Sequence, residues 1–131
     1  MKTQMIKSFN DLNVWKEGRK LTSLIYEKTR KFPREENFGL TSQMRRASVS
    51  IIANIAEGFG RSSVKEKIYF YNQSNGSLTE LQSHIYVAAD LEYISDSESI
   101  ELLKKSGEVQ ALLQGLLRST RKRLSSSAIL T

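Results

Sequence analysis

The most constraining feature of this chain is how rarely its backbone is interrupted. Its 131 residues include a single proline, Pro33, and only seven glycines. Proline removes a backbone donor and glycine weakens regular structure, so a chain with so few of them favours a small number of long elements. An all-β fold of this length would need many more turn residues. The sequence therefore predicts an all-α protein.

Apolar residues recur at helical spacing in four segments. These segments are residues 11–32, 40–57, 64–91 and 98–124. Asp11 is a good N-cap for the first helix, and Pro33 stops that helix because it cannot continue the hydrogen bonding. Ser63, followed three residues later by Glu66, has the pattern of a capping box at the start of the third helix.

Four helices with short connections favour an antiparallel up-down-up-down four-helix bundle. Residues 1–124 are predicted to form this single domain, and residues 125–131 a flexible tail. Gly58 is expected to end the second helix as its C′ residue. Gly76, flanked by serines, is expected to let two helices approach closely. The second helix is apolar around most of its circumference, which indicates burial on a second side, against another subunit.

The composition excludes several classes of site. There is no cysteine, so disulfides, thiolate metal sites and a cysteine nucleophile are excluded. The N-terminus lacks a signal-peptide pattern, and no segment has the roughly 20 apolar residues of a membrane span. A cytoplasmic protein without a membrane association is therefore expected. His84 is the only histidine and has no obvious co-ligands, so neither a metal nor another cofactor is predicted.

Positive charge concentrates in two predicted patches. The net charge is +6, and one patch lies near the C-terminus, at Arg118, Arg121, Lys122 and Arg123. A second patch lies in the first helix, at Lys16, Arg19 and Lys20. Basic patches of this kind attract phosphate backbones or acidic protein surfaces. The alternative for the C-terminal patch is a favourable interaction with the helix dipole.

A stripe of polar residues runs along the second helix, and Glu80 of the third helix could join it. The stripe comprises Gln43, Arg46, Ser50, Asn54 and Glu57. One interpretation is a phosphate site with Glu57 as a base. We favour a structural network, within the bundle or across a subunit interface, because polar groups at helix seams must be paired. No serine, histidine or carboxylate pattern has the context of a catalytic site.

Three segments carry a family resemblance: FNDLNVW at 9–15, FPREENFGLTSQMRRASVSIIANIAEGFGR at 32–61 and GSLTELQSHIYVAADLEYI at 76–94. In this order they resemble the four-helix-bundle family of 23S rRNA intervening-sequence proteins. They are similar also to the accessory variability protein of diversity-generating retroelements. The resemblance covers about residues 9–124, and none of its motifs is catalytic. The family pattern falls on Gln43, Arg46, Asn54, Glu57, Gly58, Gly76, Ser77 and Glu80.

The resemblance implies a homopentameric ring of four-helix protomers. In the retroelement relative it also implies a basic barrel that associates with a reverse transcriptase and with nucleic acid. The leading hypothesis is thus a non-enzymatic, oligomeric basic module that binds RNA or DNA electrostatically, or assists a nucleic-acid enzyme. The alternative hypothesis is a protein–protein interaction scaffold without a nucleic-acid role.

Overall fold

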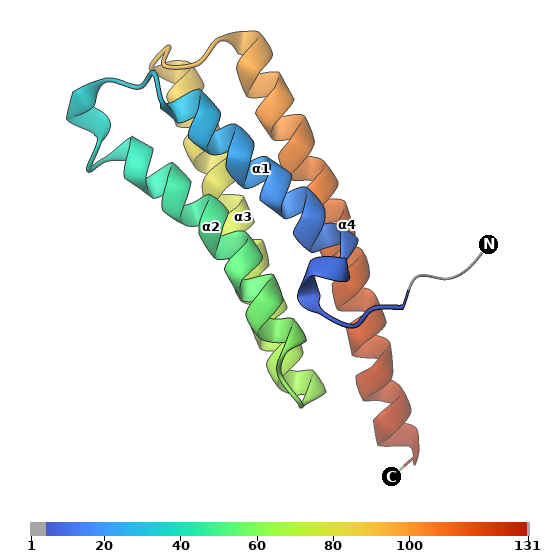
Figure 1. Cartoon of the computed structure of the whole chain (residues 1–131). Helices are drawn as coiled ribbons and strands as arrows, with labels where there is room; N and C mark the ends of the chain where they lie inside the picture. Colours follow the sequence, from blue (N-terminus) through green and yellow to red (C-terminus); the bar gives the residue numbers. More distant parts are fainter. Residues whose placement is uncertain (1–4, 131) are drawn as a thin grey trace.

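The computed structural model describes residues 5–130, with side chains as far as Leu124, and places four α-helices and no strand in that range. The helices are α1 (Asn13–Thr29), α2 (Leu40–Phe59), α3 (Val64–Asp90) and α4 (Asp96–Leu130). Two single 3-10 turns, η1 (Phe9–Asp11) and η2 (Arg34–Glu36), precede α1 and α2. The prediction of an all-α fold is confirmed, and the helices pack as an elongated bundle (Figure 1).

Of the two predicted helix caps, the one at α3 is present and the one at α1 is not. Ser63 caps α3, since its Oγ accepts from the Glu66 amide at 3.1 Å, as the capping-box pattern predicts. The prediction that Asp11 caps α1 is wrong. Its carboxylate accepts from the Lys7 and Ser8 amides at 2.9 and 3.1 Å and so closes η1, while α1 begins two residues later.

In two pairs of neighbouring helices, residues later in one helix contact residues earlier in the other. On α1, Glu17 contacts Lys105 of α4, whereas Lys31, just past the end of α1, contacts Glu98 at the start of α4. On α2 and α3, Ser50 bonds to Ser77 and Arg46 lies near Glu80. The connections 30–39 and 91–95 lie at one end of the molecule, and the α2–α3 turn lies at the other (Figure 1).

One apolar cluster joins all four helices. Leu21, Ile55, Leu78 and Leu113 are each fully buried in it, one from each helix. Small polar residues also enter the core where a backbone acceptor is available. Ser74 is fully buried and donates to the Ile51 carbonyl at 2.7 Å, which satisfies the hydroxyl and holds α3 against α2.

Two of the glycine predictions are wrong. Gly58 lies inside α2, which continues to Phe59, and a Cβ added there would lie 2.7 Å from the Tyr71 ring. Gly58 therefore provides the close α2–α3 approach that was expected of Gly76. A Cβ added at Gly76 would meet nothing within 4 Å in the described chain, because this glycine lies on the exposed side of α3.

The last helix is longer than its apolar pattern suggests. The sequence predicts its end at Leu124, but the helical backbone of α4 continues to Leu130. The predicted flexible tail, residues 125–131, falls outside the residues whose side chains the structure describes. The second apolar side of α2 is open in the bundle, where Val49 is 42% exposed.

Candidate nucleic-acid interface

The C-terminal basic patch lies on the last turns of α4 whose side chains the structure describes. Arg118, Arg121, Lys122 and Arg123 are all exposed. At 100° per residue their side chains leave the helix over roughly 200° of its circumference, so they wrap around its outer side instead of forming a flat face. None of the four has a carboxylate within 4.0 Å among the described residues.

The second patch lies on the first half of α1. Lys16 and Arg19 have no carboxylate partner among the residues that the structure covers, and the Arg19 guanidinium lies 5.1 Å from the centre of the Trp15 ring. Lys20 is paired with Glu17 at 2.8 Å, and Glu17 also accepts from Lys105 of α4 at 3.0 Å. These two lysines hold the pKa of Glu17 below its usual value.

The α1 patch lies against α4 upstream of the C-terminal patch. A shallow hollow of about 460 Å³ is lined by all three cations of the α1 patch and by Leu112 of α4. Arg123 follows Leu112 by about three turns, so both leave the same side of α4, roughly 16 Å apart along the axis. No hydrogen bond or ion pair between described residues joins the two patches directly.

The charge of Arg123 also reaches Lys67 of α3, which belongs to neither predicted patch. Burial and the nearby charge of Arg123 both lower the pKa of Lys67, in that order of importance. Lys67 donates to the Phe59 carbonyl at 2.7 Å and thereby satisfies the end of α2. Sequence analysis missed this cation because its neighbours Lys65 and Glu66 make it resemble an ordinary solvated charge run.

The polar stripe of α2 divides into three parts. Arg46 bonds to Gln43 and lies 3.9 Å from Glu80, which in turn contacts His84 Nε2 at 3.1 Å. Ser50 connects α2 to α3 through the Ser77 hydroxyl at 2.9 Å, and Asn54 donates back to the Ser50 carbonyl at the same distance. Glu57 lies apart from both groups and pairs with Arg61.

Of this stripe, Arg46 also lines a hollow where α1 meets the start of α2. Every predicted member of the stripe has a partner inside the bundle or on its own helix, as buried and half-buried polar groups require. The residue roles remain a prediction, because a subunit interface across the same stripe would use the same side chains.

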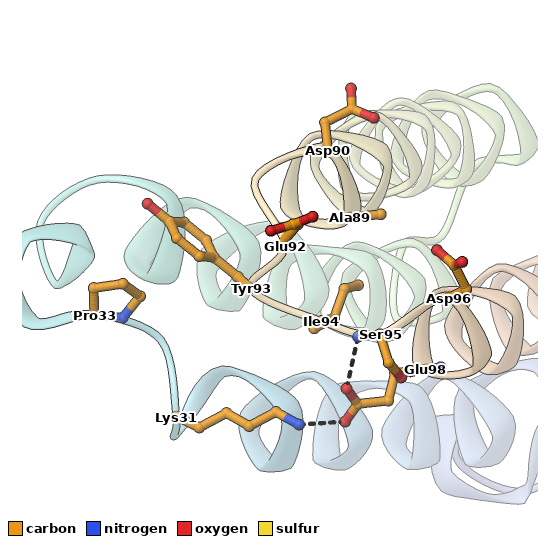
Figure 2. Close-up of a pocket in the computed structure, with 10 residues that line it drawn as sticks. All are labelled: Lys31, Pro33, Ala89, Asp90, Glu92, Tyr93, Ile94, Ser95, Asp96 and Glu98. Carbon is orange, nitrogen blue, oxygen red and sulfur yellow. Dashed lines mark hydrogen bonds and ion pairs between the residues drawn. The ribbon is translucent and has the colours of Figure 1, made fainter.

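Another hollow lies at the opposite end of the molecule from the C-terminal patch. It has about 720 Å³ and is lined by the α3–α4 connection, the adjoining ends of α3 and α4, and Lys31 and Pro33 (Figure 2). Glu98 is occupied there, since it accepts from Lys31 at 2.6 Å and from the Ser95 amide at 2.9 Å. Asp90 and Asp96 point away from this pair (Figure 2), so the carboxylates do not converge as an acid–base pair would require.

The described residues contain neither a metal-binding cluster nor a membrane-spanning helix. No group of three or more His, Asp or Glu side chains there could hold a metal ion. None of the helices in the described part of the chain is long and apolar enough to cross a bilayer.

Comparisons with known proteins place this fold. The model of the 23S rRNA-intervening sequence protein family matches residues 10–115. A crystal structure from Bacteroides thetaiotaomicron, of a protein with unknown function from the S23 ribosomal protein family, aligns with a TM-score of 0.71. The two chains are 21% identical over 79% of this chain and 97% of that one, a likeness that shows the fold alone. The comparison with curated proteins finds no significant match.

Proposed function

Because the chain belongs to the 23S rRNA-intervening sequence protein family, we propose that it is a non-catalytic, oligomeric basic module that binds RNA or DNA. Its protomer is an antiparallel four-helix bundle, and its assembly is a homopentameric ring. The contacts are electrostatic and go to phosphates, so they carry little sequence preference. Such a module would act alone or beside a nucleic-acid enzyme.

One observation carries this proposal. Of the seven cations in the two patches, only Lys20 has an acidic partner among the described residues. Some cations elsewhere are paired, as Lys28 is with Glu98 and Glu101 and Lys31 is with Glu98. Unpaired, exposed cations that gather on one part of a molecule raise the local concentration of polyanions. A ring would repeat each patch, and repeated weak sites act together through effective concentration.

The patch can be tested by charge removal. We expect a variant with Arg118→Ala, Arg121→Ala and Lys122→Ala to bind a mixed-sequence single-stranded RNA at least about tenfold more weakly than the parent. The dependence of affinity on salt should also become shallower by about two to three counterions per protomer. Fluorescence anisotropy over a range of salt concentrations measures both quantities. Arg123 is left in place because its charge acts on Lys67 and Tyr71.

A matched control separates this patch from net charge. Arg30, Arg34 and Lys104 are exposed, belong to neither patch and have no acidic partner among the described residues. Replacing all three by alanine removes the same charge and should weaken RNA binding much less. Equal binding by the parent and the patch variant would overturn the assignment.

The second candidate is a protein–protein scaffold, and the outer side of α3 favours it. Residues 71–97 contain no lysine or arginine, and Tyr69 and Tyr86 are 58% and 61% exposed on this helix. Tyr86 is an exposed tyrosine within the segment that has no cations, and such a residue suits contact with another protein. RNA binding that is absent even at low salt, together with loss of a native partner on Tyr86→Ser substitution, would favour this function over the first.

A further inference from the structure

A hollow outside both basic patches has the features of an anion site. It has a volume of about 660 Å³ and lies where α1 meets the start of α2. Its wall includes Tyr26 of α1 and Thr41, Ser42, Arg45, Arg46 and Val49 of α2. Sites for small molecules span roughly 300–1,000 Å³ and combine apolar walls with a few polar groups, and this hollow has both.

Arg45 is a positioned cation without a counter-ion. Its Nε donates to the Thr29 hydroxyl at 2.9 Å, and its guanidinium carbon lies 4.7 Å from the centre of the Tyr26 ring. The side chain is half-buried, and no carboxylate of the described chain lies within 4.0 Å of it. The four N–H bonds of its two Nη atoms are therefore available to a ligand. A half-buried charge held in this way gains from an anion.

Thr41 provides an independent sign of a missing ligand. The residue is 5% exposed, and its Oγ1 is the single buried side-chain polar atom of the described residues that has no hydrogen-bond partner. A buried hydroxyl without a partner is destabilising, and native structures seldom keep one without a reason. Thr41 lines the hollow, so a rotation about its Cα–Cβ bond would bring this hydroxyl to an oxygen atom bound there and supply that partner.

The backbone at the start of α2 adds further donors. No side chain of the N-cap residue, Gly39, is available to cap the helix. The Leu40 amide is taken by Glu36 Oε1 at 3.0 Å, and the amides of Thr41 and Ser42 have no acceptor among the described residues. Free amides in a first helical turn, together with the helix dipole, favour a negatively charged group.

We propose that this hollow binds a phosphate monoester. Arg45 and the Thr41 hydroxyl, together with the two free amides, hold the phosphate oxygens. A tetrahedral group with several oxygens uses donors on different sides better than a planar carboxylate does. Tyr26 and Val49, which are 39% and 42% exposed, form an apolar flank for the rest of the ligand. The phosphate belongs either to a free nucleotide or to the 5′ end of an oligonucleotide.

Calorimetric titration with uridine 5′-monophosphate tests the site. We expect saturable binding of the nucleotide, weaker binding of inorganic phosphate and none of uridine. Arg45→Gln and Thr41→Val should each weaken nucleotide binding about tenfold, because each removes a donor to a charged group. Matched controls are Arg30→Gln and Thr79→Val, which change exposed residues outside the hollow and should bind as the parent does.

The Thr41→Val variant keeps the test independent of folding. Removing a hydroxyl that has no partner should leave the melting temperature unchanged or raise it, while ligand binding falls. An unchanged or raised melting temperature together with weaker nucleotide binding supports the site. A purely structural residue would lose binding only through a loss of stability. Binding of the nucleotide by both site variants as tightly as by the parent would overturn the proposal, and so would failure of the parent to bind nucleotide or phosphate.

Binding of two oligonucleotides that differ only in whether their 5′ end carries a phosphate distinguishes the two sources of the phosphate. Tighter binding of the 5′-phosphorylated form, lost on Arg45→Gln substitution, identifies an oligonucleotide end. Equal binding of the two forms, with nucleotide binding retained, identifies a free nucleotide. The inference does not depend on the C-terminal patch, because the Arg118, Arg121 and Lys122 triple variant should keep its nucleotide binding.

Discussion

At the scale of single residues, the same amino acid has opposite roles in neighbouring helices. Gly58 is buried, and a methyl group there would lie 2.7 Å from the ring of Tyr71, which is itself 1% exposed. Gly76 is exposed and would meet nothing. The difference lies in what each glycine faces, and it decides whether replacement by alanine lowers or raises the stability.

We expect Gly58→Ala to lower the melting temperature and Gly76→Ala to preserve or raise it. The first change overpacks a ring that has no room to move, which costs roughly 1–3 kcal/mol. The second adds helix propensity at an open site, a gain of up to about 1 kcal/mol. Thermal unfolding followed by circular dichroism compares the two variants. Equal melting temperatures would mean that Tyr71 gives way to the added methyl group.

At the scale of elements, the start of α4 is fixed by a reciprocal capping contact. Glu98 accepts from the Ser95 amide at 2.9 Å, and the Ser95 hydroxyl accepts from the Glu98 amide at 3.1 Å. The free Glu98 oxygen accepts from Lys31, just beyond the end of α1. The hydrogen bond from Lys31 and that from the Ser95 amide lower the pKa of Glu98 from 4.5 to about 2.

This shift makes one part of the stability depend on pH. A carboxyl group whose pKa is lower in the folded state stabilises the fold fully above its unfolded value of 4.5, and the contribution is lost as pH falls toward 2. We expect Glu98→Gln to lower the unfolding free energy at neutral pH by about 1–2 kcal/mol, less than the full shift because water reaches the pair. Urea unfolding between about pH 7 and pH 3 measures it.

Glu101→Gln is the matched control for this measurement. Glu101 also pairs with a lysine of α1, Lys28 at 3.2 Å, but its side chain is 51% exposed and it caps no helix. Its replacement should change stability less and leave the loss of stability at low pH intact. An unaltered acid dependence in Glu98→Gln would contradict the role given to the capping contact.

At the scale of the whole molecule, the protomer leaves large apolar side chains uncovered. Phe38, in the α1–α2 connection, is 98% exposed, and Val49 and Tyr86 are exposed on α2 and α3. Full burial of a phenylalanine is worth about 1.5–3 kcal/mol, so each copy of such a residue in a ring would contribute measurably to assembly. The same side chains would have no partner in an isolated protomer.

We expect sedimentation equilibrium to give the mass of five copies of the 14.9 kDa chain. Phe38→Ser should shift the equilibrium toward smaller species as the protein is diluted, because it removes apolar surface that the ring would bury. Phe38→Leu keeps most of that surface and serves as the control. A parent protein that sediments as a protomer at micromolar concentration would rule out the ring and weaken the case for a multivalent basic surface.

The sequence by itself determined the helices and much of their core. Periodic apolar residues, a single proline and local capping patterns act within a few residues of one another, so the four segments and the Ser63 cap could be read directly. The two basic patches also needed no tertiary information, since exposed charge is visible in composition.

Only the tertiary structure decided which of these residues meet. It gave Gly58, not Gly76, the close helix contact, brought Lys67 within the electrostatic reach of Arg123, and held Arg45 of α2 against Thr29 and Tyr26 of α1. Each of these relations joins residues whose spacing or exposure depends on packing between helices. Local sequence carries no record of such distances, because side-chain interdigitation in the folded bundle fixes them.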